Sequence, residues 1–175
     1  MNNGSEIKPI VLPDPIRFKD FGGDRNKYLE RLYEVFKSDF CVNKATFNGL
    51  RVFPLRDPIK DGRMQSFNHI ISSGDEELFR TESFSRAEKI PWISPILKSV
   101  PHPNLKVWEN IRKKGKKKKK KVSTIIWYEE KRLLIVLERN NDRYFLVTAY
   151  SKTKPKDIDR LRKEYEDYIK NGLPV

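Results

Sequence analysis

Three apolar segments in the C-terminal half constrain the fold of this chain most strongly. Residues 122–128 read VSTIIWY, residues 133–137 read LLIVL, and residues 143–150 read RYFLVTAY. Such β-branched and aromatic residues fit the pleated surface of a sheet. Because short charged links of the kind found in hairpins join the segments, we predict that they form an antiparallel meander.

Two segments with helical spacing lie on either side of this meander in the sequence. From Arg25 to Phe40 the apolar residues recur on one stripe, and Asp24 is placed to cap the first turn. Pro155 is suited to open a second helix, which Asn171 and Gly172 would end. Both patterns predict amphipathic helices that pack on the sheet.

The segments between residues 50 and 108 are shorter and less regular. Residues 50–55 predict a strand, and residues 64–71, MQSFNHII, predict an extended or buried segment. Ser85 and Glu88 have the spacing of a capping box, so short helical pieces are expected from there to about Lys98, limited by prolines. A turn or short helix is expected around Trp108.

Together these patterns predict an α+β fold. N-terminal helices would precede an antiparallel sheet of about four strands, and a C-terminal helix would pack on that sheet. At 175 residues, the chain suits one domain. We expect an N-terminal arm over residues 1–23 and a single domain over residues 24–175, with a flexible Lys-rich loop at 112–121.

The net charge of +13 is concentrated in one place. Residues 112–121, RKKGKKKKKK, hold nine cations, which leaves the remaining 165 residues at +4. Such a run repels itself, so it predicts a solvated loop, and it attracts nucleic acid through counterion release. We favour nucleic acid over a membrane, with Lys116, Lys117, Lys118, Lys119, Lys120 and Lys121 as the binding residues.

Several chemistries lack sequence support. No Cys/His cluster, phosphate-binding loop or dinucleotide fingerprint occurs, so no metal or cofactor is expected. The single cysteine, Cys41, and an N-terminus without a secretion pattern predict a reducing, cytoplasmic location. No apolar run approaches the roughly 20 residues that cross a bilayer.

Of the catalytic chemistries considered, metal-independent acid–base catalysis is left, and histidine is the residue best suited to it near neutral pH. His69 lies within an apolar segment and would be held in place, whereas His102 lies between two prolines. A hydrogen-bonded, partly buried structural histidine is the alternative for His69. In the last strand, alternation predicts that Thr148 and Tyr150 share a face, where they either contact a phosphate or a base or serve as ordinary strand residues.

The order of three motifs resembles the barnase/EndoU/colicin/RelE-like (BECR) nucleases, in particular their phage- and prophage-associated branch. The motifs are FNHIISSG, SRAEKIPWI and YFLVTAY, and the similarity covers about residues 67–150 and the closing helix. The resemblance implies two helical elements before a four-stranded antiparallel sheet. It also implies a metal-independent ribonuclease site on that sheet.

The resemblance also implies roles for individual residues. His69 would be the general acid or base, Arg86 would bind the scissile phosphate, Thr148 would supply a hydroxyl contact, and Tyr150 would support it. Arg80 is a second candidate phosphate ligand. The RNA 2′-hydroxyl would be the nucleophile, leaving a cyclic 2′,3′-phosphate.

The expected function is therefore RNA cleavage, by a toxin or effector of a mobile element. RNA, with tRNA among the candidates, would be the substrate, and a cognate inhibitor protein is a candidate partner. Two alternatives remain: a nucleic-acid-binding module without chemistry, and a protein-interaction domain whose basic loop contacts an acidic partner. The presence of a cyclic phosphate on the RNA product discriminates between cleavage and binding.

Overall fold

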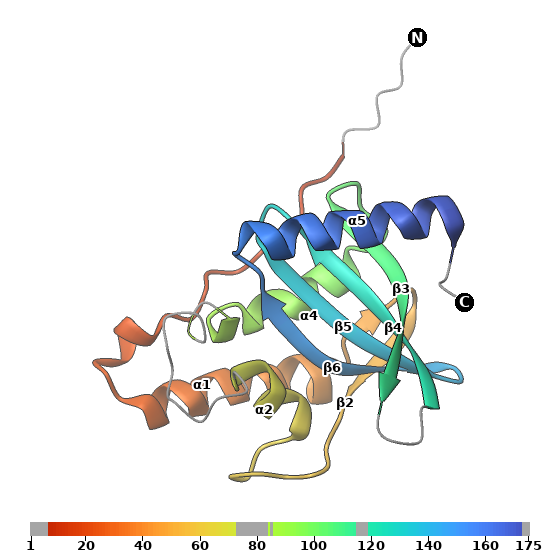
Figure 1. Ribbon diagram of the computed structural model, residues 1–175. Helices are drawn as coiled ribbons and strands as arrows, with labels where there is room; N and C mark the ends of the chain where they lie inside the picture. The colour runs from red at the N-terminus through yellow and green to blue at the C-terminus, as the bar shows by residue number, and fades with distance from the viewer. Residues whose placement is uncertain (1–6, 73–83, 85, 115–118, 173–175) are drawn as a thin grey trace.

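A curled sheet with helices on both faces forms the body of the molecule (Figure 1). The computed structural model describes residues 7–72, 84, 86–114 and 119–172. The described α-helices are α1 (Arg25–Lys37), α2 (Gln65–Ile71), α4 (Ile90–Lys98) and α5 (Pro155–Asn171). The strands are β1 (Thr46–Phe47), β2 (Leu50–Pro54), β3 (Leu105–Lys114), β4 (Lys119–Tyr128), β5 (Leu133–Asn140) and β6 (Arg143–Ser151).

The predicted α+β class and C-terminal helix are confirmed, but the predicted sheet is wrong in size and direction. Six strands lie in the order β1-β2-β6-β5-β4-β3. The expected meander is present as β4, β5 and β6, whereas β2 pairs with β6 in parallel. A two-residue turn joins β1 to β2 because Asn48 and Gly49 adopt the left-handed backbone that such hairpins require, with φ of 49° and 74°.

Strand β3 replaces the turn or short helix expected around Trp108. It pairs with β4 in an unbroken antiparallel register from Leu105↔Tyr128 to Lys114↔Lys119. The sequence of this strand, LKVWENIRKK, is largely polar. The strand is stabilised by its cross-strand hydrogen bonds and by burial of the Trp108 side chain, which is 2% exposed. The loop expected at 112–121 is correspondingly shorter, since residues 112–114 and 119–121 continue these strands, and Lys116, Lys117 and Lys118 lie outside the described residues.

The segment around His69 is helical, which corrects the extended conformation considered for residues 64–71. In α2, Phe67 and Ile70 are both fully buried at a spacing of three residues, as one helical face requires. The spacing of the apolar residues in this short run is compatible with a strand or a helix. The helix forms because it buries this face against the rest of the core. His69 therefore lies on a helix and not on a strand.

The remaining helices agree with the sequence patterns. The Asp24 carboxylate accepts a hydrogen bond from the Lys27 backbone N–H at 3.1 Å, as an N-cap should. One helical turn containing Arg86 precedes α4, and Ser85 of the expected capping box lies outside the described residues. Helix α5 ends before Gly172, whose φ is +74°.

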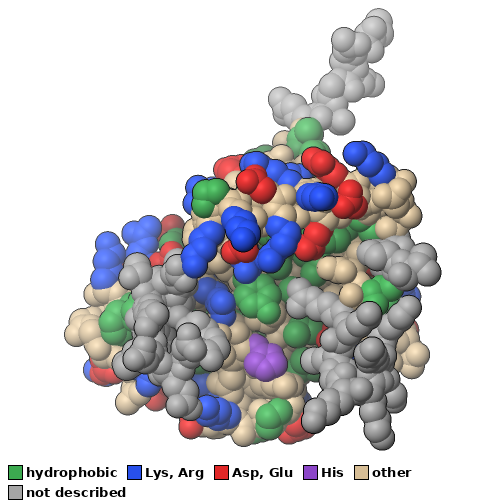
Figure 2. Space-filling model, viewed as in Figure 1, with side chains coloured by type: hydrophobic (Ala, Val, Ile, Leu, Met, Phe, Trp, Pro, Cys, Tyr) green, Lys and Arg blue, Asp and Glu red, His purple; other side chains and the backbone are tan. Residues whose placement is uncertain are grey.

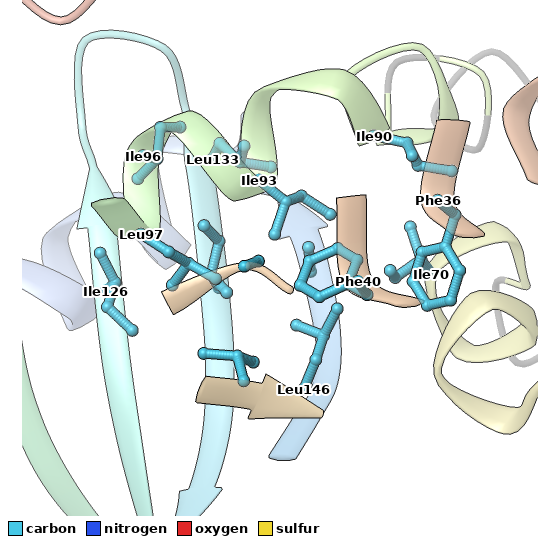
Figure 3. Close-up of a cluster of buried hydrophobic side chains, with 14 of the residues drawn as sticks. Phe36, Phe40, Ile70, Ile90, Ile93, Ile96, Leu97, Ile126, Leu133 and Leu146 are labelled. Carbon is cyan, nitrogen blue, oxygen red and sulfur yellow. The ribbon is translucent and has the colours of Figure 1, made fainter. Parts of the chain in front are cut away.

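The two faces of the sheet bury separate clusters. One face packs against α1, α2 and α4, and Figure 3 shows side chains such as Phe36, Ile93 and Leu146 meeting there. The other face packs against α5 through Trp108, Trp127 and their neighbours. Burying one large apolar side chain stabilises a fold by roughly 1.5–3 kcal/mol, so these clusters hold the sheet firmly between its helices.

Candidate active site

A β-bulge in β6 determines the local geometry of the candidate site. Val136 of β5 pairs with Thr148, whereas the next residue, Leu137, pairs with Leu146, so Val147 is the extra residue. The bulge also corrects the predicted alternation. Tyr144 and Leu146 face the cluster under α1 and α4, whereas Tyr150 packs in the cluster under α5.

Helix α2 lies against β6 at this bulge. The parallel pairing with β2 ends at Leu146, so none of the described strands pairs with the following residues on that side. The Ser66 hydroxyl donates to the Leu146 carbonyl, and the Thr148 hydroxyl donates to the His69 carbonyl at 3.3 Å. These bonds join the helix to the bulged strand and satisfy polar groups that a regular ladder would have paired.

The imidazole of His69 takes part in the same junction. Its Nδ1 lies 3.4 Å from the Val147 carbonyl oxygen. Because a carbonyl only accepts, this contact assigns the proton of the neutral ring to Nδ1 and leaves the lone pair on Nε2. The side chain is partly exposed, and in Figure 2 a histidine lies in the middle of the face that carries α2, β6 and α5 in Figure 1. His69 therefore has a fixed tautomer and access to solvent.

Arg86 binds the end of the same helix. Its Nη1 donates to the carbonyl of Ser72 at 2.8 Å and lies 3.4 Å from that of Ile70. Carbonyls at a helix C-terminus carry partial negative charge, which a guanidinium neutralises. The guanidinium carbon also lies 5.1 Å from the ring centre of Tyr150, within the range of a cation–π contact.

Tyr150 is flanked by cations. Besides Arg86, the Lys152 ammonium lies 5.4 Å from its ring centre. The positive charge at this end of β6 is increased by Lys89, which donates to the Ser151 hydroxyl at 2.9 Å and to the Lys131 carbonyl at 3.1 Å. Burial lowers the pKa of Lys89 below its usual value. Nothing in the sequence around Lys89 distinguishes it from a surface lysine.

A hollow of about 240 Å³ opens beside the imidazole. His69, Asn68 and Ser72 line one side, and the loop containing Lys60 and Asp61 lines the other. The Asn68 amide fixes that loop by donating to the carbonyls of Lys60 and Arg63 at 3.1 Å and 3.0 Å. The hollow gives small molecules or one residue of a polymer access to the histidine.

The predicted site residues thus separate into three groups. His69 contacts the bulge of β6, whereas Arg86 binds the end of α2 and contacts the ring of Tyr150. Thr148 is 3% exposed and its hydroxyl donates to the His69 carbonyl, so that hydroxyl is not open to a substrate as predicted. Arg80 lies outside the described residues.

Part of the basic segment predicted to bind nucleic acid lies in β4. Lys119, Lys120 and Lys121 belong to this strand, which β5 separates from β6. Lys121 forms an ion pair with Glu138 at 3.0 Å. Lys121 therefore does not line the histidine hollow.

The described residues form neither a cluster of metal ligands nor a membrane-spanning helix. Among the described residues, no group of three or more His, Cys, Asp or Glu side chains is arranged to hold a metal ion. No helix in the described ranges has the length and apolar character needed to cross a bilayer.

Comparisons with known proteins give no relative for this chain. No family model, no curated protein and no solved structure matches it.

Proposed function

We propose that this protein is a metal-independent ribonuclease that cleaves RNA through attack of its own 2′-hydroxyl. One observation carries the proposal: His69 of α2 contacts the bulge of β6, and Arg86 binds the carbonyls at the end of the same helix and also contacts Tyr150. An imidazole and a guanidinium anchored to one short helix are groups suited to moving a proton and stabilising a phosphate.

His69 supplies the acid–base chemistry in this proposal. Its Nδ1 is engaged with the Val147 carbonyl, so Nε2 carries the lone pair that accepts the proton of the 2′-hydroxyl. The 2′-oxygen attacks phosphorus, the bond from phosphorus to the 5′-oxygen breaks, and a proton returns to that departing oxygen. The products are a 2′,3′-cyclic phosphate and a 5′-hydroxyl.

Arg86 supplies positive charge where negative charge develops. The phosphorane formed during attack carries more charge on its oxygens than the starting diester, so a fixed cation lowers the barrier. The contacts of Arg86 with the carbonyls of Ile70 and Ser72 hold the guanidinium at the end of the helix that carries His69 before substrate binds. Thr148 acts through His69 and is a positioning residue.

A matched pair of histidine variants tests the proposal. RNA is incubated with the full chain in EDTA, comparing the wild type with His69→Gln and His102→Gln. We expect His69→Gln to lose cleavage by a factor of about 10² to 10⁴ and His102→Gln to retain it, because only His69 touches the reacting atoms. Equal cleavage by the wild type and His69→Gln contradicts the proposal.

A second candidate, nucleic-acid binding without chemistry, is favoured by the register of β3 and β4. Their ends pair Arg112 with Lys121, Lys113 with Lys120 and Lys114 with Lys119. Cations therefore occur in both paired strand ends, and binding of a polyanion to such a basic segment is favoured by counterion release. Steeply salt-dependent RNA binding by the wild type, with no cleavage, supports this candidate over the ribonuclease. The structure gives no observation favouring a protein-interaction domain with an acidic partner.

A further inference from the structure

A second hollow lies beneath α5, on the face of the sheet opposite α1 and α4. It measures about 410 Å³, which is within the size range of small-molecule sites. Its apolar wall includes Trp108, Ile125 and Leu134, from three neighbouring strands. These three side chains are 2–3% exposed and close the floor of the hollow, so the partly exposed ring of Tyr150 is the aromatic surface that a flat ligand can contact.

The charged groups around this hollow balance one another. Lys152 and Arg160 line it, but both approach the Asp157 carboxylate, at 3.8 Å and 3.1 Å. Glu164 adds a second negative charge to the lining. Two cations thus face two carboxylates, so the hollow does not favour a phosphate over a neutral ligand.

Two polar side chains in the lining are available to a ligand. Within the described parts of the chain, neither the Asn110 amide nor the Glu164 carboxylate has a hydrogen-bond or ion-pair partner. The amide both donates and accepts, and the carboxylate accepts. A heteroaromatic ring whose edge carries N–H donors and acceptors matches this arrangement together with the apolar wall.

Tyr150 connects this hollow to the candidate active site. It lines the hollow, and its ring centre lies 5.1 Å from the guanidinium carbon of Arg86. We infer that the hollow beneath α5 binds a nucleobase of the RNA strand, next to the phosphate held at Arg86. This inference rests on the proposed function, since it assigns the phosphate and the base of one substrate to the two sides of Tyr150.

Binding of uncharged nucleosides tests the inference without requiring cleavage. Adenosine, guanosine, cytidine and uridine are each titrated into the full chain, with ribose 5-phosphate as a ligand that lacks a base, and chemical shifts are followed by NMR. We expect at least one nucleoside to shift the Trp108 indole resonance and ribose 5-phosphate to leave it unchanged. Binding of ribose 5-phosphate alone at this hollow overturns the inference.

Two carboxylates on one helix give a matched control. Glu164→Gln removes the charge in the lining, whereas Glu166→Gln makes the same change at an exposed position of α5 outside it. We expect Glu164→Gln to weaken nucleoside binding about ten- to hundredfold, as the loss of a hydrogen bond to a charged group does, and Glu166→Gln to have no effect. Asn110→Phe, which fills the hollow, should abolish binding.

The results separate this inference from the proposed function. If the wild type cleaves RNA and depends on His69, but no nucleoside binds in the hollow, the base site is wrong and the ribonuclease proposal stands. If a nucleoside binds and Glu164→Gln weakens it while no RNA is cleaved, the base site stands and the catalytic proposal fails. Equal weakening by Glu164→Gln and Glu166→Gln also counts against the base site.

Discussion

The Nδ1 atom of His69 lies 3.4 Å from the carbonyl oxygen of Val147, the extra residue of the β6 bulge. The same contact has a structural and a chemical consequence. It gives a partner to a strand carbonyl at an edge that β2 does not reach, and it fixes the ring tautomer with Nε2 as the acceptor. The structural and catalytic interpretations of this histidine are therefore compatible.

The contact of His69 with the Val147 carbonyl predicts different stabilities for two substitutions of the histidine. His69→Gln can keep an N–H donor near the Val147 carbonyl, so its free energy of unfolding should fall by less than about 1 kcal/mol. His69→Leu leaves the carbonyl without this donor and should cost about 1–3 kcal/mol. Denaturation with urea measures both values. Equal stability of the two variants would show that the contact with Val147 contributes nothing.

Thr148 should affect catalysis through the position of His69. Thr148→Val removes the hydroxyl that donates to the His69 carbonyl and should lower the free energy of unfolding by about 1 kcal/mol. We also expect a lower kcat at unchanged KM and a shifted pH profile of cleavage, with rescue of all three by Thr148→Ser. A purely structural residue would lower stability without moving the pH profile.

Arg86→Lys keeps the positive charge but loses the planar set of donors. A lysine cannot reproduce contacts with two helix carbonyls and a fixed position beside Tyr150. We expect the single-turnover cleavage rate to fall about 10²- to 10³-fold while RNA affinity changes less than tenfold. A large loss of affinity with an unchanged single-turnover rate would instead assign Arg86 to substrate binding.

Tyr28 should make the fold sensitive to alkaline pH. Burial raises the pKa of its phenol, with the charge of Glu88 adding to the effect, and the hydroxyl donates to the Ile16 carbonyl at 3.0 Å. The unfolded chain ionises this group above its ordinary pKa of 10.0 while the folded chain does not, so stability should fall as pH rises beyond that value. Tyr28→Phe should cost about 1 kcal/mol at pH 8 and show a smaller alkaline loss. Equal pH dependence in both proteins excludes Tyr28 as the cause.

The cations of residues 112–121 should support RNA binding. Lys113→Glu replaces one of these positive charges with a negative one and should weaken RNA binding and reduce its dependence on salt concentration. Binding isotherms at several salt concentrations measure both effects. Unchanged RNA affinity would remove this segment from the nucleic-acid interface.

The sequence was sufficient for elements with a long, clear period. The stripe of α1 and the capping Asp24 predicted a helix correctly, and the three apolar segments ending in YFLVTAY predicted the meander correctly. The parallel position of β2 beside β6 depends on contacts between residues about ninety apart, such as Val52 with Tyr144, which no local pattern encodes. The Asn48-Gly49 pair was the one local signal for the hairpin of β1 and β2.

The candidate site was likewise predictable only in part from the sequence. Residue type selected His69, and the family resemblance selected Arg86; the structure places His69 on α2 and Arg86 at the end of the same helix, in contact with Tyr150. The role of Thr148 could not be predicted, because the bulge at Val147 changes which side chains share a face. Lys89 was missed because its burial comes from the ends of β5 and β6, which are remote in sequence.

A DNA oligonucleotide containing one ribonucleotide tests the central claim most directly. The wild-type chain is incubated with it in EDTA, and the ends of the fragments are analysed by mass spectrometry. We expect a single cut on the 3′ side of the ribonucleotide, a 2′,3′-cyclic phosphate on the upstream fragment, and no reaction with His69→Gln or with the all-DNA strand. No cut, a cut in the all-DNA strand, or a 3′-hydroxyl on the upstream fragment would contradict 2′-hydroxyl attack at His69.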